Sequence, residues 1–183
     1  GRSRAGFPLV TKFSVTGAPA FADLDDDGEF ELVVGSQDFG LHVVDARGKP
    51  LPGFPVRAGY RIYEGPAIAD LDGDERLDVV FASADGMIHV VDAGGEPLPG
   101  FPVRVGQRIF GGVAVGDVDR DGVLDVAAMT ADGTVAVVDA KGKPVAGFPA
   151  PLGSADAAAS PLLIDLGGDG TLLSCARLVA GRG

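Results

Sequence analysis

The sequence predicts an all-β protein built from repeated four-stranded units, and three observations support this fold class. First, the tripeptide Gly-Phe-Pro occurs four times at a constant spacing of 47 residues, beginning at Gly6, Gly53, Gly100 and Gly147. Second, each full interval contains short runs of apolar and β-branched residues separated by turns rich in Asp and Gly. Third, no stretch repeats its apolar residues at the 3.6-residue period of a helix. A constant period of this length indicates a repeat architecture.

The 47-residue spacing divides the chain into five segments. The first carries one Gly-Phe-Pro and an alternating apolar run at residues 7–15, which we expect to be the outer strand of a preceding repeat. Three complete units, here called blades 1, 2 and 3, follow it, and the last segment supplies only part of a fourth blade. The five segments cover residues 1–17, 18–58, 59–105, 106–152 and 153–183.

Each complete unit contains four predicted strands in chain order. In blade 1 they fall at residues 19–24, 31–36, 41–44 and 56–58. Asp-Gly pairs favour a tight hairpin between the second and third strands of the later units, and an Asp-x-x-Gly turn follows every third strand. Prolines precede the fourth strand, which therefore belongs at the edge of its sheet, where a missing backbone donor is tolerated.

Four-stranded units with a period near this length are typical of β-propeller blades. Three complete blades and a partial fourth predict an open arc or a propeller fragment. The end blades of an open arc expose apolar faces, so we expect the chain to associate with itself through these faces.

A nine-residue loop with acidic side chains joins the first and second strands of each blade. The loops run from Asp23 to Glu31, from Asp70 to Asp78 and from Asp117 to Asp125. Acidic residues occupy positions 1, 3, 5 and 9 of each loop, and alternate residues of a tight loop can turn their carboxylates toward one point. Because Ca²⁺ takes six to eight oxygen ligands at about 2.3–2.6 Å, the loops predict up to three calcium sites. An EF-hand is excluded, because its twelfth position requires a bidentate Glu.

The acidic loops and the strands before them resemble the FG-GAP (VCBS-like) repeats of integrin α-subunit propellers and of many secreted bacterial proteins. The segments that carry the resemblance are 18–28, 66–74 and 112–122, and the likeness extends over roughly residues 6–173. It implies a calcium ion in each loop, with a backbone carbonyl supplied by position 7. The ligands that it implies are Asp23, Asp25, Asp27, Glu29, Glu31, Asp70, Asp72, Asp74, Arg76, Asp78, Asp117, Asp119, Asp121, Val123 and Asp125.

Two loops depart from the family pattern. Glu75 stands where the family usually has Gly, and a left-handed backbone costs a non-glycine residue about 1–2 kcal/mol, so the second site is expected to be weaker. In the fourth unit, the loop at residues 165–173 lacks acidic groups at positions 3 and 9, so we expect no calcium there.

Charge and hydropathy exclude some partners. The formal charge of −11 argues against nucleic acid, which clustered Lys and Arg hold by its phosphates. No apolar run approaches the roughly 18 residues of a membrane span. The single Cys175 does not identify the redox compartment. Weak carboxylate sites fill where free calcium is about millimolar, which favours an extracellular, periplasmic or cell-surface location.

The connections between blades contain aromatic residues beside arginines, a combination enriched at binding hot spots. In propellers such connections reach the face opposite the calcium loops, so these residues are candidate ligand contacts, although they could also simply pack on blade edges. The candidates are Tyr60, Arg61, Tyr63, Arg108 and Phe110.

The resemblance implies an extracellular binding, adhesion or scaffold module with a protein or carbohydrate ligand. The alternative is an accessory or catalytic propeller of a secreted carbohydrate-active enzyme, similar to calcium-containing polysaccharide lyases. The sequence offers no Ser-His-Asp order and no Cys-His set, so we assign no catalytic residue. His42 and His89 share one blade position and are expected to be half-exposed strand residues.

Overall fold

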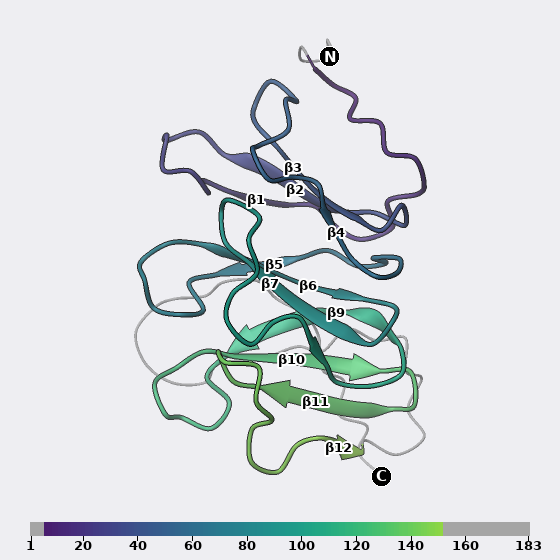
Figure 1. Cartoon of the computed structure of the whole chain (residues 1–183), viewed down its shortest axis with the longest axis vertical. Helices are drawn as coiled ribbons and strands as arrows, with labels where there is room; N and C mark the ends of the chain where they lie inside the picture. The colour runs from purple at the N-terminus through teal and green to yellow at the C-terminus, as the bar shows by residue number, and fades with distance from the viewer. Residues whose placement is uncertain (1–5, 152–183) are drawn as a thin grey trace.

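The structure, a computed structural model, describes residues 6–151 as three four-stranded antiparallel sheets, with no helix among these residues. Figure 1 shows the sheets stacked along the long axis of the molecule, with blade 1 at the top and blade 3 at the bottom. The three complete blades of the predicted fold class are therefore confirmed. The predicted partial fourth blade and its loop lie outside the described residues.

The strands of each blade follow one another in space as they do in the chain. Blade 1 contains β1 (Ala20–Ala22), β2 (Glu31–Gly35), β3 (Gly40–Val44) and β4 (Val56–Arg57). Blade 2 contains β5 (Ala67–Ala69), β6 (Asp78–Ser83), β7 (Met87–Val91) and β8 (Val103–Arg104). Blade 3 contains β9 (Ile109–Gly116), β10 (Asp125–Thr130), β11 (Thr134–Val138) and β12 (Ala150–Pro151). The proline-preceded strands β4, β8 and β12 are outermost, as predicted.

The inner strand of blade 3 is longer than its counterparts. β9 has eight residues, whereas β1 and β5 have three each. It continues because its pairing with β10 includes an irregularity between Ala128 and Thr130, after which Thr130 pairs with Ile109. Phe110, which we expected in a connection, therefore belongs to the inner strand of blade 3.

Residues 7–15 do not form the predicted strand. A fourth strand pairs only with the third strand of its own blade, and the described residues contain no such partner for this segment. The segment nevertheless lies where the repeat places it. The backbone N–H of Gln37 donates to the Ser14 carbonyl at 3.0 Å, and one repeat later the N–H of Ala84 donates to the Arg61 carbonyl at 2.9 Å.

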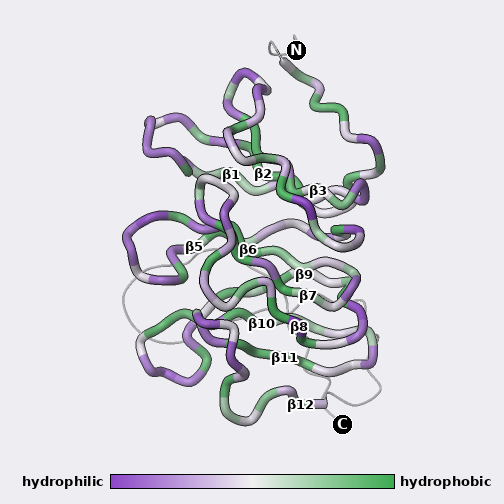
Figure 2. Tube along the Cα trace, in the orientation of Figure 1, coloured by the Kyte–Doolittle hydropathy of each residue, from purple (hydrophilic) through white to green (hydrophobic). Residues whose placement is uncertain are grey.

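The hydrophobic core lies between the blades. Because side chains alternate along a strand, Val79 of β6 faces blade 1, whereas Val80 faces blade 3. Val33 of blade 1 and Val126 of blade 3 complete the two interfaces, and all four side chains are buried. Burying one such side chain fully contributes about 1.5–3 kcal/mol. Figure 2 shows the corresponding pattern, in which apolar strands alternate with hydrophilic loops.

Packing between blades also buries His89, which we expected to be half-exposed. Its ring stacks on Phe81 with centroids 4.6 Å apart, and its Nε2 lies 3.1 Å from the Ser83 hydroxyl. Blade 1 covers this face of blade 2. The equivalent face of blade 1 has no described blade against it, and His42 there is only partly buried and pairs with Asp38 at 3.1 Å.

The repeated Gly-Phe-Pro glycine marks a close backbone contact between neighbouring blades. A Cβ atom added to Gly53, whose φ is 84°, would lie 1.8 Å from the carbonyl oxygen of Gly94. A Cβ on Gly100 would lie 2.1 Å from the carbonyl oxygen of Lys141 in the next blade. Real Cβ atoms do not approach a carbonyl this closely, so the repeat requires Gly at these positions.

Candidate functional site

The three acidic loops lie along one edge of the stack. Each loop leaves the inner strand of its blade and returns on the second strand. Figure 1 shows all three loops on the left, opposite the hairpin turns that join the second and third strands. The connection that contains Arg61 lies at the hairpin edge, because its carbonyl accepts the N–H of Ala84 beside the β6–β7 turn. The predicted placement of the connections opposite the acidic loops therefore agrees with the fold.

The last acidic residue of each loop begins the second strand and is buried. These residues are Glu31, Asp78 and Asp125. One oxygen of each carboxylate accepts the N–H of loop position 2, which is Leu24, Leu71 or Val118, at 2.8–2.9 Å. This bond ties the end of the loop to its beginning.

Burial has a large effect on these carboxylates. It raises the pKa of Asp78 to about 6, and the charges of Asp72 and Asp74 act in the same direction against the hydrogen bond from Leu71. Burial likewise raises the pKa of Glu31 and of Asp125. In each loop, burial and the neighbouring Asp charges thus disfavour the ionised form of one carboxylate.

The first acidic residue of each loop shapes the turn by accepting backbone hydrogen bonds. In loop 2, Asp70 Oδ1 accepts the N–H groups of Gly73 and Asp74 at 2.8 and 3.1 Å, and Oδ2 accepts that of Glu75 at 3.0 Å. At position 5, Asp74 accepts the N–H of Arg76 at 2.9 Å. Loop 3 repeats these four bonds and loop 1 repeats three of them, so the acidic residues fold the loop that presents them.

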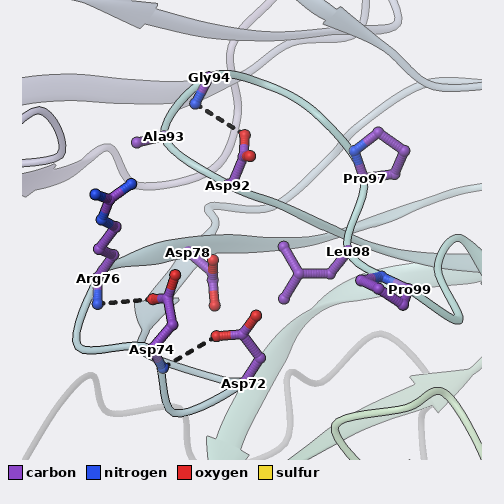
Figure 3. Close-up of a pocket in the computed structure, with 10 residues that line it drawn as sticks. All are labelled: Asp72, Asp74, Arg76, Asp78, Asp92, Ala93, Gly94, Pro97, Leu98 and Pro99. Atoms are coloured by element: carbon purple, nitrogen blue, oxygen red, sulfur yellow. Dashed lines mark hydrogen bonds between the residues drawn. The ribbon is translucent and has the colours of Figure 1, made fainter.

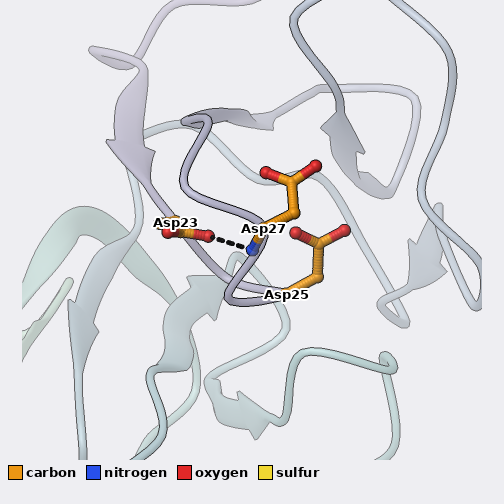
Figure 4. Close-up of side chains that lie close together, drawn as sticks. All are labelled: Asp23, Asp25 and Asp27. Carbon is orange, nitrogen blue, oxygen red and sulfur yellow. Dashed lines mark hydrogen bonds between the residues drawn. The ribbon is translucent and has the colours of Figure 1, made fainter.

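In each loop three carboxylates come together, with one oxygen from each within 4.8 Å of the other two. Figure 4 shows the group in loop 1. The three groups are Asp23, Asp25 and Asp27; Asp70, Asp72 and Asp78; and Asp117, Asp119 and Asp125. The fourth predicted carboxylate of each loop, Glu31, Asp74 or Asp121, stays outside its group. The carbonyl ligands at Glu29, Arg76 and Val123 stay predictions.

Three carboxylates of loop 2 line a hollow of about 220 Å³, and the turn between β7 and β8 lines its other side. Figure 3 shows Asp72, Asp74 and Asp78 on the loop side, with Asp92 on the turn side. The sequence did not suggest Asp92 as part of this site. Its Oδ1 accepts the N–H groups of Gly94 and Glu96 at 2.8 and 2.9 Å, so it stabilises its own turn.

The backbone removes the reason for expecting the second loop to bind calcium more weakly than the first and third. Glu75 has the expected left-handed conformation, with φ of 69°. Loops 1 and 3, however, have a left-handed non-glycine at position 4, where Asp26 has φ of 58° and Arg120 has φ of 65°. Loop 2 has Gly73 at that position. Each loop therefore carries one strained residue, at position 4 in loops 1 and 3 and at position 6 in loop 2.

The hairpin edge carries a cluster of aromatic rings and arginines. The Tyr60 ring stacks on Phe39 at 5.5 Å and 17°, and Arg61 lies 6.0 Å from the centroid of the Tyr60 ring. Tyr63 meets Phe110 edge-on at 5.7 Å. Hydrogen bonding to Tyr63 also raises the pKa of the Arg61 guanidinium. Four of the five predicted ligand contacts are thus brought together.

Arg108, the fifth predicted contact, is exposed and takes no part in these ring contacts. Phe39 was not among the predicted contacts. The sequence could have identified Phe39, because it breaks the repeat: the equivalent turn positions of blades 2 and 3 hold Gly86 and Gly133. We call this surface the aromatic–arginine strip, and it consists of Phe39, Tyr60, Arg61, Tyr63, Arg108 and Phe110.

Two other arginines near the strip have structural roles. Arg57 donates from Nη1 to the carbonyl of Asp38 at 2.8 Å, and Arg104 donates to the carbonyl of Asp85 at 2.6 Å. Each therefore joins an outer strand to the hairpin turn of its own blade.

Within residues 6–151, no helix is long and apolar enough to cross a membrane. Residues 70–128 match the family model of the FG-GAP-like repeat, a range that begins with the second acidic loop and ends in β10. The chain matches none of the curated proteins.

The solved structures that are similar to the chain include the following three. The computationally designed Ika4 protein has a TM-score of 0.54 at 20% identity, and the alignment covers 79% of this chain and 78% of Ika4. BamB from Moraxella catarrhalis has a TM-score of 0.47 at 20% identity over 73% of this chain and 36% of BamB. BBS1N, in complex with ARL6DN, has a TM-score of 0.44 at 18% identity over 79% of this chain and 48% of BBS1N. The chain thus spans less than half of BamB and of BBS1N, and the likeness to Ika4 concerns the fold alone.

Proposed function

Because residues 70–128 form an FG-GAP-like repeat within a stack of four-stranded blades, we propose that the chain is a calcium-binding propeller module. Up to three ions bind at the acidic loops, and the module serves as an extracellular binding, adhesion or scaffold segment. The observation that carries the proposal is the convergence of three carboxylates in every loop, with oxygens within 4.8 Å of one another.

The donor set fits calcium. Carboxylate oxygens are the hard ligands that Ca²⁺ prefers, and oxygens separated by less than 4.8 Å can contact one ion at about 2.3–2.6 Å. The buried Asp78 and Asp125 supply one carboxylate to groups 2 and 3, and burial raises the pKa of both. A divalent cation replaces repulsion between these carboxylates with attraction, which favours their ionised forms.

Bound calcium stabilises the blades. The loop connects the inner strand to the second strand, so the ligands are in place only when both strands are paired. An ion that binds the folded chain alone adds RT ln(1 + [Ca²⁺]/Kd), or about 2.7 kcal/mol per site at a hundredfold excess over Kd.

An extracellular, periplasmic or cell-surface location follows from the chemistry of these sites. Their position 3 and position 5 carboxylates are exposed, and exposed carboxylate sites that bind weakly need about millimolar free calcium to fill. The FG-GAP-like repeat supports the same location by family resemblance.

Calorimetric titration with calcium tests the proposal. The parent should bind up to three ions within residues 6–151, and a chelator should lower its melting temperature. Asp25→Asn removes a carboxylate of the first group and should abolish one binding event. Asp26→Asn is the matched control, because it removes the same charge from the adjacent residue, which lies outside the group. A parent that binds no calcium at millimolar concentration, or equal loss in both variants, would contradict the proposal.

A further inference from the structure

From the aromatic–arginine strip we infer that the module binds a linear acidic polysaccharide, in which successive sugars carry carboxylates. The inference rests on the proposed binding role and names the ligand class and the surface that recognises it. The connections that carry Arg61 and Arg108 bond to the hairpin turns of blades 2 and 3, and these turns lie opposite the acidic loops (Figure 1).

The rings of the strip are exposed enough to bind a ligand. Tyr60 is 46% exposed and Phe39 is 39% exposed, although the two rings already stack on each other. Tyr63 holds Phe110 edge-on, which leaves a second aromatic surface one blade further along. Exposed, preorganised rings of this kind offer flat apolar surfaces on which the C–H faces of sugar rings can pack.

The backbone at Phe39 is strained, and this strain suggests a functional reason for the side chain. Phe39 has φ of 71°, in the left-handed region that bulky side chains rarely adopt. The same turn position holds Gly86 in blade 2 and Gly133 in blade 3, both with positive φ. Blade 1 therefore keeps a strained, exposed aromatic residue where Gly forms the same turn. Strain maintained at a surface position points to function.

The arginines of the strip can bind carboxylates. Arg61 is held beside the rings of Tyr60 and Tyr63, and Arg108 occupies the same repeat position one blade later. A guanidinium binds a carboxylate through two parallel hydrogen bonds, a geometry that Lys cannot provide.

Three acidic residues of the hairpin turns have hydrogen-bond partners, whereas Glu64, next to Tyr63, is half-buried and burial raises its pKa. Asp38 is buried and pairs with His42, Asp85 accepts a hydrogen bond from the Ser83 hydroxyl, and Asp132 accepts one from Thr130. A hydroxyl partner does not neutralise a carboxylate, so an anionic ligand must bind directly at the guanidinium groups of Arg61 and Arg108, against a chain charge of −11.

The repetition of the strip favours a linear, regular ligand. Blades 2 and 3 present an arginine at equivalent positions, Arg61 and Arg108, and an aromatic residue at equivalent positions, Tyr63 and Phe110. The Tyr63 and Phe110 rings are in contact, with centroids 5.7 Å apart, so the two pairs form one continuous surface across neighbouring blades. A polymer whose carboxylates and sugar faces also recur regularly can contact both pairs at once.

An acidic peptide fits the strip less well. Extended peptides gain affinity by pairing with free backbone groups at a sheet edge. Here the neighbouring donors are already used, because the N–H groups of Ala84, Val105 and Ala131 bond to carbonyls of the connections and turns at 2.8–2.9 Å. Recognition must therefore rely on rings and guanidinium groups, which suit an acidic sugar.

A short oligogalacturonate is the probe, and binding to the full chain is measured by calorimetry, with a neutral dextran oligosaccharide and a poly-glutamate peptide as competitors. The double variant Arg61→Gln/Arg108→Gln should weaken binding at least about tenfold, since each lost charged hydrogen bond accounts for a factor of this order. Arg47→Gln is the matched control. It makes the same Arg→Gln exchange once, in the exposed turn after β3 on the acidic-loop side, and should leave binding unchanged.

Phe39→Gly separates binding from folding. It introduces the residue of blades 2 and 3 and removes the strain, so its melting temperature should not fall, whereas oligogalacturonate binding should weaken severalfold. Unchanged binding in this variant and in the arginine double variant would overturn the inference. Poly-glutamate binding as tight as that of the oligogalacturonate would also overturn it, in favour of a peptide ligand.

A chelator distinguishes the two proposals. Binding through the strip should persist without calcium, at a temperature where the chain stays folded. Suppose that the chelator abolishes oligogalacturonate binding and that the arginine variants do not weaken it. Calcium at the acidic loops then bridges the polymer to the chain, so the strip inference fails and the calcium proposal stands. If the parent binds the oligogalacturonate but no calcium, the calcium proposal fails and the strip inference stands.

Discussion

Two glycines with the same backbone conformation differ in what surrounds them. Gly53 and Gly73 have φ of 84° and 80°, but an added Cβ on Gly53 meets the Gly94 carbonyl whereas one on Gly73 meets nothing within 4 Å. Gly53→Ala should therefore lower the free energy of unfolding by about 3 kcal/mol, as the backbone penalty and the clash combine. Gly73→Ala should lower it by only about 1–2 kcal/mol, from the backbone penalty alone.

Urea denaturation of the two variants and the parent measures this difference. Equal losses would mean that the contact between Gly53 and the Gly94 carbonyl adjusts without cost.

The buried His89 should make stability depend on pH. Burial lowers the pKa of His89, against the opposing charge of Asp85. The unfolded chain therefore takes up this proton more readily, near its ordinary pKa of about 6.5. The stabilisation from neutral His89 is complete above that value and is lost as the pH falls from there toward the lower pKa of the folded state.

His89→Gln keeps a polar partner for Ser83 but does not titrate in this range. The difference in free energy of unfolding between parent and variant, measured by urea denaturation at pH 7.5 and at pH 5, should shrink or reverse at the lower pH. A difference that does not change with pH would show that His89 is not kept neutral by the fold.

At the scale of elements, each acidic loop contains one non-glycine residue in the left-handed backbone conformation, which a Cβ atom makes unfavourable. Glu75→Gly and Arg120→Gly should each raise the free energy of unfolding, because Gly adopts positive φ without steric cost. The expected gain is about 0.5–1 kcal/mol, since the greater entropy of unfolded Gly offsets part of the relief. Arg76 follows Glu75 in loop 2 and does not have positive φ. Arg76→Gly should therefore destabilise the chain, because Gly gains entropy in the unfolded state and no strain is relieved.

Thermal and urea denaturation in the presence of chelator measure these effects on the loop itself. Destabilisation by all three substitutions would show that positive φ is not costly in these loops.

At the scale of the whole molecule, the outward face of blade 1 lacks a partner among the described residues. Phe21 and Phe30 are 66% and 67% exposed there, beside a hollow of about 480 Å³ that Leu32 also lines. The equivalent residues of blade 2, Ile68 and Leu77, pack against blade 1. An apolar blade face without a blade against it should drive association between copies of the chain.

The double variant Phe21→Ser/Phe30→Ser should therefore reduce self-association in sedimentation velocity and leave the melting temperature nearly unchanged. Ile68→Ser, the same repeat position inside the stack, should lower the melting temperature and leave association unchanged. A parent that remains a monodisperse monomer at high concentration would contradict the prediction.

The sequence alone determined the features that depend on local chemistry. The positions of β2, β3 and β4 follow from apolar runs and from turns with a required Asp or Gly, and those signals lie within a few residues of the structure they specify. The acidic loops could also be predicted from the sequence, because their bonds are local: Asp70 accepts hydrogen bonds from residues no more than five positions away. The outer position of β4 followed from prolines that cannot donate to a ladder.

Only the tertiary structure decided the features that depend on one blade lying against another. Residues 7–15 have an apolar pattern suited to a strand, but residues 6–151 contain no third strand for them to pair with. His89 is buried because blade 1 covers it, and Phe39 meets Tyr60 because the chain returns to the hairpin edge 21 residues later. The alternation of residues along a strand predicts which of its faces is apolar. What covers that face depends on contacts between residues distant in the chain, which no local pattern contains.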